Sequence, residues 1–156
     1  MSQKKSKTWA KYDVLELRGS TLGVVGYGDI GRACAKLAHV YGMRVVAIRR
    51  NPMLAMGDPL CDLVLGSGKE WLNQLNRESD YILCSAPLTE ETRGLIGKAQ
   101  FEHAKKDAVF INLGRGPVVD EVALIEALKT GKLKGAALDV FTNEPLPASS
   151  ELWELE

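Results

Sequence analysis

Apolar runs alternate with segments of helical periodicity along most of the chain. The runs predict short β-strands at residues 22–26, 44–48, 63–65, 81–84, 109–112 and 135–140. The intervening segments 30–41, 70–76, 98–104 and 120–130 predict helices, and Ile30, Cys34, Leu37, Ala38 and Tyr41 share one helical face, which we expect to be buried. This alternation predicts an α/β fold, a doubly wound parallel sheet with helices on both faces.

The residues before the first strand form a separate pattern. Residues 8–17 carry Trp9, Tyr12, Leu15 and Leu17, which predicts an extra helix that caps the sheet or packs on a partner subunit. The basic residues before it predict a solvated end. We therefore expect a leading helix and basic tail over residues 1–17 and one folded domain over residues 18–156.

Composition narrows the class of protein. The chain has 156 residues, 46% hydrophobic and 26% charged, with zero net charge, so no global field recruits nucleic acid or a membrane surface. No apolar run approaches the ~20 residues needed to span a bilayer. Cys34, Cys61 and Cys84 fit neither a disulfide framework nor a zinc site, which predicts reduced thiols and a cytoplasmic location. The basic start leaves organelle targeting open.

A glycine motif, Gly26-Tyr27-Gly28-Asp29-Ile30-Gly31, follows the first predicted strand and opens the first long helix. In that context G-x-G-x-x-G predicts a dinucleotide site. Gly26 permits a tight turn, Gly28 admits the pyrophosphate, and Gly31 lets helix and strand pack closely. The helix start, with Asp29 and Ile30, supplies free N–H groups for the phosphates.

The end of the second strand indicates which dinucleotide binds. NAD sites usually place Asp or Glu there, but this chain has no carboxylate between Asp29 and Asp58. Arg49 and Arg50 occupy the position instead, and arginine suits a 2′-phosphate. The sequence therefore favours NADP(H), and NAD(H) stays possible if the arginines point to solvent.

Two charged groups follow the later strands, Arg115 in INLGRGPVVDE and Glu144 in DVFTNEPLP. Ligands of open parallel sheets bind outside the carboxyl ends of the strands. An arginine and a glutamate at that edge predict a substrate clamp and an acid–base pair.

These segments, with SAPLTEETRGLIG, resemble the nucleotide-binding domain of the D-isomer-specific 2-hydroxyacid dehydrogenases. The resemblance implies that Arg115 grips the substrate carboxylate and polarises the keto group. It implies that Glu144 hydrogen-bonds the catalytic histidine, and that Asp139 holds the nicotinamide carboxamide. It also implies a lining for the nicotinamide half of the cofactor from Ser85, Ala86, Pro87, Thr92, Leu113 and Gly114.

The resemblance further implies a catalytic histidine in a Pro-His pair beyond the EPLP segment, after another strand. The chain stops at Glu156, so we expect a nucleotide-binding domain truncated before its last strand, without the substrate domain. His39 and His103 lie in predicted helices and do not replace the proton donor. We expect a fragment that binds NADP(H) but turns over 2-keto acids poorly, cut from a homodimeric parent acting on a small 2-keto or 2-hydroxy acid such as glyoxylate or hydroxypyruvate.

Two other classes stay open. Transcriptional corepressors that sense dinucleotides share this fold and these site residues, so fold alone does not exclude them. Another Rossmann enzyme is the second, because the adenosylhomocysteine hydrolases also carry a GYGD loop. The segments around Arg115 and Glu144 argue against it.

Overall fold

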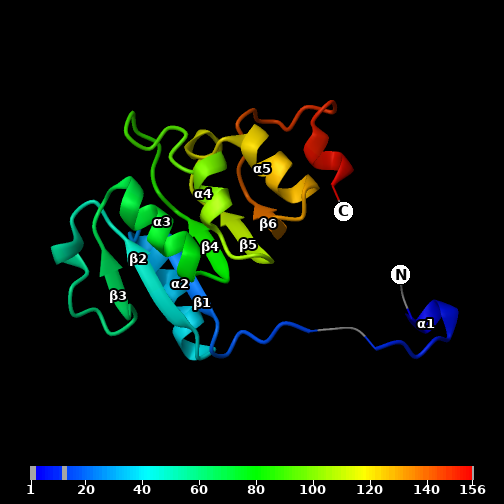
Figure 1. Ribbon diagram of the computed structural model, residues 1–156, viewed down its shortest axis with the longest axis horizontal. Coiled ribbons are helices and arrows are strands. Elements are labelled where there is room, and N and C mark those ends of the chain that lie inside the picture. Colours follow the sequence, from blue (N-terminus) through cyan, green and yellow to red (C-terminus); the bar gives the residue numbers. More distant parts are fainter. Residues whose placement is uncertain (1–2, 12–13, 156) are drawn as a thin grey trace.

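The computed structural model describes residues 3–11 and 14–155, which form one parallel sheet with helices on both faces (Figure 1). The sheet order β3-β2-β1-β4-β5-β6 is that of the doubly wound dinucleotide fold, which confirms the predicted fold class. Its strands are β1 (Thr21–Val25), β2 (Arg44–Ile48), β3 (Leu63–Leu65), β4 (Tyr81–Cys84), β5 (Ala108–Asn112) and β6 (Leu133–Leu138).

The helices are α1 (Gln3–Ser6), α2 (Asp29–Val40), α3 (Lys69–Glu78), α4 (Lys98–His103) and α5 (Glu121–Lys129). Short 3₁₀ turns follow at Pro52–Leu54, Gly116–Val118 and Glu151–Glu154. Asp120 caps α5 by accepting a hydrogen bond from the Ala123 N–H, and Gly131, at φ +68°, follows its end as the sequence predicts. Within the described ranges, no helix is long and apolar enough to cross a membrane.

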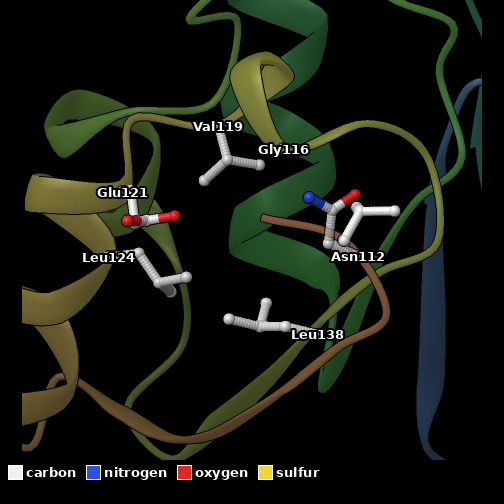
Figure 2. Close-up of a pocket in the computed structure, with 7 residues that line it drawn as sticks. Asn112, Gly116, Val119, Glu121, Leu124 and Leu138 are labelled. Atoms are coloured by element: carbon white, nitrogen blue, oxygen red, sulfur yellow. The ribbon is translucent and has the colours of Figure 1, made fainter. Parts of the chain in front are cut away.

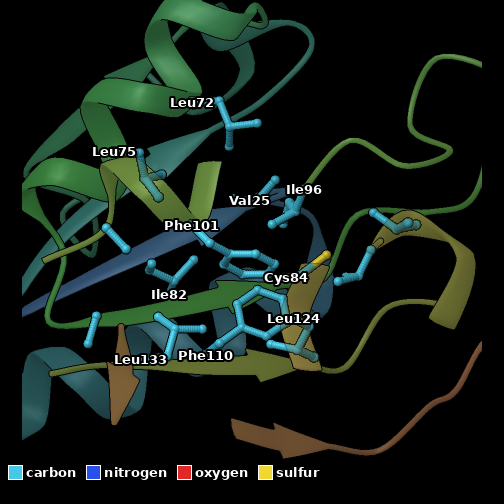
Figure 3. Close-up of a cluster of buried hydrophobic side chains, with 14 of the residues drawn as sticks. Val25, Leu72, Leu75, Ile82, Cys84, Ile96, Phe101, Phe110, Leu124 and Leu133 are labelled. Atoms are coloured by element: carbon cyan, nitrogen blue, oxygen red, sulfur yellow. The ribbon is translucent and has the colours of Figure 1, made fainter. Parts of the chain in front are cut away.

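The core has two parts, one on each face of the sheet. Helices α3, α4 and α5 lie on one face, where Phe101 of α4 meets Phe110 of β5 edge to face at 5.4 Å (Figure 3). Helix α2 covers the other face over β1 and β2. Gly23 permits the close approach of α3, because a Cβ there would overlap Leu75 and Ser79.

The buried face of α2 differs from the sequence prediction. Gly31, Ala35 and Ala38 face the sheet, whereas Leu37 and Tyr41 are 62% and 59% exposed. The small residues let the helix backbone lie close to the sheet, which turns the large apolar side chains outward. Of the predicted face, Ala38 is buried and Cys34 packs against the core, so counting apolar positions alone selects the buried face only in part.

The predicted leading helix over residues 8–17 is also wrong. Residues 8–11 and 14–17 are not helical, and the helix that forms, α1, lies earlier in the chain and apart from the sheet (Figure 1). Tyr12, part of the prediction, lies outside the described residues. Trp9 is 95% exposed and Leu15 is also exposed, although Leu17 packs against the core, so the described residues leave most of the expected apolar face uncovered. A short isolated helix is marginal in water.

Candidate functional site

The six strands of the described sheet end in one row. Their last residues are register partners from one edge of the sheet to the other, in the order Leu65, Ile48, Val25, Cys84, Asn112 and Leu138. The residues that follow therefore emerge side by side along a single edge. Arg49, Gly26, Ser85, Leu113 and Asp139 each donate a backbone N–H to a neighbouring strand end. The separate motifs of the sequence thus reach a common surface.

The glycine loop has little room for side chains on its protein side and is open on the other. Gly26 has φ +95°, and a Cβ there would lie 2.5 Å from the Ala86 nitrogen. A Cβ on Gly31 would lie 2.7 Å from the Gly26 carbonyl oxygen. At Gly28 no described protein atom lies within 4 Å of such a Cβ. The loop therefore leaves free space directly above Gly28.

That free space lies at the start of α2. No side chain of the described residues caps this helix, so the N–H groups of its first turn are available to an external acceptor. The positive end of the helix dipole favours an anion there. The predicted residues Asp29 and Ile30 form this first turn and are exposed. The geometry fits the pyrophosphate of a dinucleotide.

The carboxyl end of β2 carries the two predicted arginines. Arg49 is half-buried and Arg50 is exposed, and neither forms an ion pair within the described part of the chain. The pKa of Glu91 is lowered, first by a hydrogen bond from Thr89 and more weakly by the positive charge of Arg50. The positive charge of Arg50 thus influences Glu91, which lies in the loop that follows β4.

A cavity of about 420 Å³ joins several of the predicted residues. It is lined by Ile30, Ser85, Ala86, Pro87, Leu88, Leu113, Gly114 and Arg115. Arg49, Arg50, Thr92, Asp139 and Glu144 do not line it. The volume suits a planar ring system. The cavity has mostly apolar walls and one charged end, at Arg115.

Thr92 shapes one wall from outside. Its hydroxyl donates to the Pro87 carbonyl at 2.6 Å and accepts from the Thr89 N–H at 2.8 Å. At the start of the same segment, Ser85 donates its hydroxyl to the Gly26 carbonyl at 2.9 Å. The Thr92 bonds shape the segment after β4, and the Ser85 bond ties it to the glycine loop, so the two parts of the candidate site are held together.

Arg115 is exposed, and its backbone is held by Asn112, a residue that the sequence reading did not single out. Asn112 is 2% exposed; its Oδ1 accepts the Gly114 N–H at 3.0 Å, and its Nδ2 donates to the Arg115 carbonyl at 3.4 Å. The Arg115 guanidinium donates to the Gly114 carbonyl at 2.8 Å and has no carboxylate partner among the described residues. The signal in the sequence was a polar residue closing an apolar strand.

Glu144 lies on an exposed loop after β6, and its Oε1 accepts the Phe141 N–H at 2.9 Å. Glu121, at the start of α5, accepts the Thr142 N–H at 3.1 Å. Gly116 packs directly on this segment, since a Cβ there would overlap the Phe141 carbonyl. The loop of Arg115 and the loop of Glu144 are therefore in contact through Gly116.

A small pocket of about 10 Å³ lies beneath that contact. Figure 2 shows Asn112, Glu121 and Leu138 around it, with Val119 and Leu124 closing the remaining sides. Neither Gly116 nor Glu121 was singled out from the sequence, because their roles depend on a backbone segment more than twenty residues further along the chain.

Asp139 follows the last residue of β6 directly. Its backbone N–H donates to the Asn112 carbonyl at 3.1 Å, and its side chain is exposed. Cys84 also lies at a strand end, but it is fully buried, and burial raises its pKa to about 11. A thiol in that state is a poor nucleophile, so the site contains no activated cysteine at this position.

The fold and this edge together define a dinucleotide-binding domain. The family described as "D-isomer specific 2-hydroxyacid dehydrogenase, NAD binding domain" matches residues 1–156. The chain is 46% identical over 143 residues to a glyoxylate/hydroxypyruvate reductase B of Enterobacter sp. (strain 638), covering 88% of this chain and 41% of that protein. It is 42% identical over 132 residues to a glyoxylate reductase of Aeropyrum pernix, covering 85% of this chain and 38% of that protein.

Among solved structures, a D-isomer specific 2-hydroxyacid dehydrogenase from Xanthobacter autotrophicus Py2, in complex with NADPH and MES, superimposes with a TM-score of 0.87 at 36% identity. The match covers 98% of this chain and 47% of that one. The chain thus spans less than half the length of these relatives. It belongs to the NAD-binding-domain family of the D-isomer specific 2-hydroxyacid dehydrogenases, as the sequence motifs predicted.

Proposed function

We propose that this chain is the NADP(H)-binding part of an oxidoreductase that transfers hydride between nicotinamide and a small 2-keto or 2-hydroxy acid, of the glyoxylate or hydroxypyruvate type. The observation that carries the proposal is the single row of strand ends. It brings the glycine loop, the β2 arginines and the Arg115 loop to one edge. Reductases of glyoxylate and hydroxypyruvate among the relatives support the substrate class.

Arg49 and Arg50 support a preference for NADP(H) over NAD(H). Both are cationic at the strand end where a carboxylate would bind the ribose 2′-hydroxyl of NAD. Neither is neutralised by an ion pair within the described residues. A guanidinium offers charge-assisted, bidentate hydrogen bonds to a 2′-phosphate. The NADPH complex of the Xanthobacter relative agrees with this choice.

The chain's own residues divide the work. Gly26, Gly28, Asp29, Ile30 and Gly31 receive the pyrophosphate. Ser85, Ala86, Pro87, Leu113 and Gly114 enclose the nicotinamide half, Thr92 holds the loop after β4, and Asp139 accepts from the carboxamide. When bound, the reduced nicotinamide supplies the hydride.

Arg115 and Glu144 act on the substrate side. Arg115 binds the substrate carboxylate with its fork of donors. Glu144 orients a histidine and stabilises its protonated form, which keeps the proton donor effective near neutral pH. That histidine and the substrate domain belong to a longer polypeptide in this proposal. The chain alone therefore binds cofactor without efficient turnover. The proposal also includes that the whole enzyme is a homodimer and is cytoplasmic.

Nucleotide affinities of an Arg49 variant test the cofactor preference. Arg49→Asp should weaken NADPH binding by about tenfold or more, the scale of one lost charge-assisted contact, and should leave NADH affinity nearly unchanged. Isothermal titration of both nucleotides measures the two dissociation constants. Arg77→Asp, on an exposed residue in the last turn of α3 and so near the start of β4 at the opposite end of the sheet, is the charge-matched control. Equal affinities of wild type and Arg49→Asp for NADPH would remove Arg49 from the site.

A further inference from the structure

Asp58 forms a hub between the segment that follows β2 and the glycine loop. Its Oδ2 accepts the Arg32 Nε–H at 2.6 Å and the Tyr27 hydroxyl at 3.2 Å. Its Oδ1 accepts the Arg32 Nη2–H at 3.3 Å and the Leu60 backbone N–H at 3.1 Å. Both carboxylate oxygens are therefore fully engaged, and the Asp58 side chain is only 12% exposed.

The partners of Asp58 lie in the phosphate-binding element itself. Tyr27 stands between Gly26 and Gly28, and the residue is 1% exposed with its ring in the core under α2. Arg32 lies in the first turns of α2, and its backbone N–H donates to the Gly28 carbonyl at 2.8 Å. One carboxylate thus holds both the middle of the loop and the start of the helix.

The ionisation states favour this arrangement at neutral pH. The hydrogen bond from Arg32 is the largest of the effects that lower the pKa of Asp58, so the carboxylate stays charged. Burial, followed by the charge of Asp58, raises the pKa of Tyr27 to about 12, so the hydroxyl keeps its proton and donates it in a hydrogen bond. The Arg32 charge is meanwhile committed to Asp58.

We propose that Asp58 is a positioning residue for the dinucleotide pyrophosphate, acting through Tyr27 and Arg32 without touching the ligand. This rests on the proposed function, since it assumes that the Gly28 loop receives a pyrophosphate. A loop fixed before binding loses less conformational entropy when the ligand arrives. Removing the hub leaves the loop to be ordered by the ligand, so affinity falls for every nucleotide that carries the pyrophosphate, whether or not it has a 2′-phosphate.

The test compares Asp58→Ala, Asp58→Asn and Tyr27→Phe in the 156-residue chain. Tyr27→Phe keeps the buried ring and removes only the hydroxyl bond, so it tests the hub even if Asp58→Ala folds poorly. Glu78→Gln is the matched control, because Glu78 forms an ion pair of the same 2.6 Å length with Arg44, at the start of β2 and so at the opposite end of the sheet.

We expect Asp58→Ala to weaken NADPH and NADH alike, by about tenfold, the scale of a lost hydrogen bond to a charged group. Asp58→Asn, which retains an acceptor oxygen, should recover part of the loss. Tyr27→Phe should weaken both nucleotides by a smaller common factor, and Glu78→Gln should change neither. Adenosine 2′-monophosphate, which lacks the pyrophosphate, should bind every variant as it binds wild type, in NMR shift titrations.

Four results overturn the proposal. Unchanged dinucleotide affinity in Asp58→Ala and Tyr27→Phe would show that the loop needs no brace. Tighter binding in Asp58→Ala would show that a released Arg32 contacts phosphate directly. A parallel loss for adenosine 2′-monophosphate would indicate general unfolding. Failure of the wild-type chain to bind either dinucleotide would refute the proposed function as well, whereas selective loss of NADPH in Arg49→Asp would uphold that function whatever the outcome at Asp58.

Discussion

At the residue scale, the loops of Arg115 and Glu144 meet at a backbone contact that tolerates no side chain. A Cβ on Gly116 would overlap the Phe141 carbonyl, and backbone cannot yield as a flexible side chain can. The Phe141 N–H donates to the Glu144 carboxylate, and the Thr142 N–H donates to Glu121. Movement of Phe141 would therefore displace the carboxylate proposed to orient the proton donor.

Gly116→Ala tests this contact. We expect the free energy of unfolding to fall by about 1–3 kcal/mol, the usual cost of forcing atoms into a packed site. Amide exchange at Phe141 and Thr142 should also become faster, since both bonds depend on the position of that segment. Urea denaturation and hydrogen-exchange NMR measure the two effects.

Gly135→Ala is the matched control, because no described atom lies within 4 Å of a Cβ there and the position lies in strand β6. We expect its stability to change by less than about 0.5 kcal/mol, as for an unstrained surface position. Equal stability of both alanine variants would mean that the segment after β6 moves aside without cost.

At the element scale, the sequence predicted the strands more reliably than the helix faces. Residues 22–25 of β1 are buried on both sides because α2 packs on one face of this strand and α3 on the other, so the run stands out in the sequence. The buried face of α2 does not stand out in the sequence, because its residues are small and the large apolar residues of this helix face outward. The prediction of a leading helix was wrong for a related reason: apolar spacing shows which residues could be buried, and within the described residues no surface covers Trp9.

The corrected face of α2 makes a prediction of its own. Ala35 is fully buried against the sheet, so Ala35→Leu should overpack this interface and lower the free energy of unfolding by about 1–3 kcal/mol. Leu37→Ala removes an apolar side chain that is 62% exposed and should change stability by less than about 0.5 kcal/mol. Chemical denaturation of the two variants compares the faces directly. A larger loss for Leu37→Ala would restore the face predicted from the sequence.

At the scale of the whole molecule, the sequence predicted which segments meet along one edge of the sheet as the candidate site, but not how they are fixed. Motif residues such as Gly28, Arg49 and Arg115 could be found because each follows a recognisable strand. Glu121 and Asp58 could not, since each acts through a bond to backbone or side chain in another segment. Such residues have no local pattern, and the fold alone brings their partners within reach.

The whole site can be tested by ligand-induced stabilisation of the chain. A ligand that binds only the folded state at 100 times its dissociation constant adds about 2.7 kcal/mol to the free energy of unfolding. For a domain of this size that corresponds to a rise in Tm of about 5–10 °C. We expect NADPH to produce this shift, and NADH at the same concentration to produce a smaller one.

Gly28→Val separates binding from folding in that experiment. Gly28 is exposed, its φ of −104° is accessible to any residue, and no described atom lies within 4 Å of its Cβ position, so the variant should fold with an almost unchanged Tm. The new side chain would fill the space left for the pyrophosphate, so the shift with NADPH should vanish. An undiminished rise in Tm with NADPH in Gly28→Val would place the nucleotide elsewhere on the molecule, because a pyrophosphate and a valine side chain cannot both occupy the space at the N-terminus of α2.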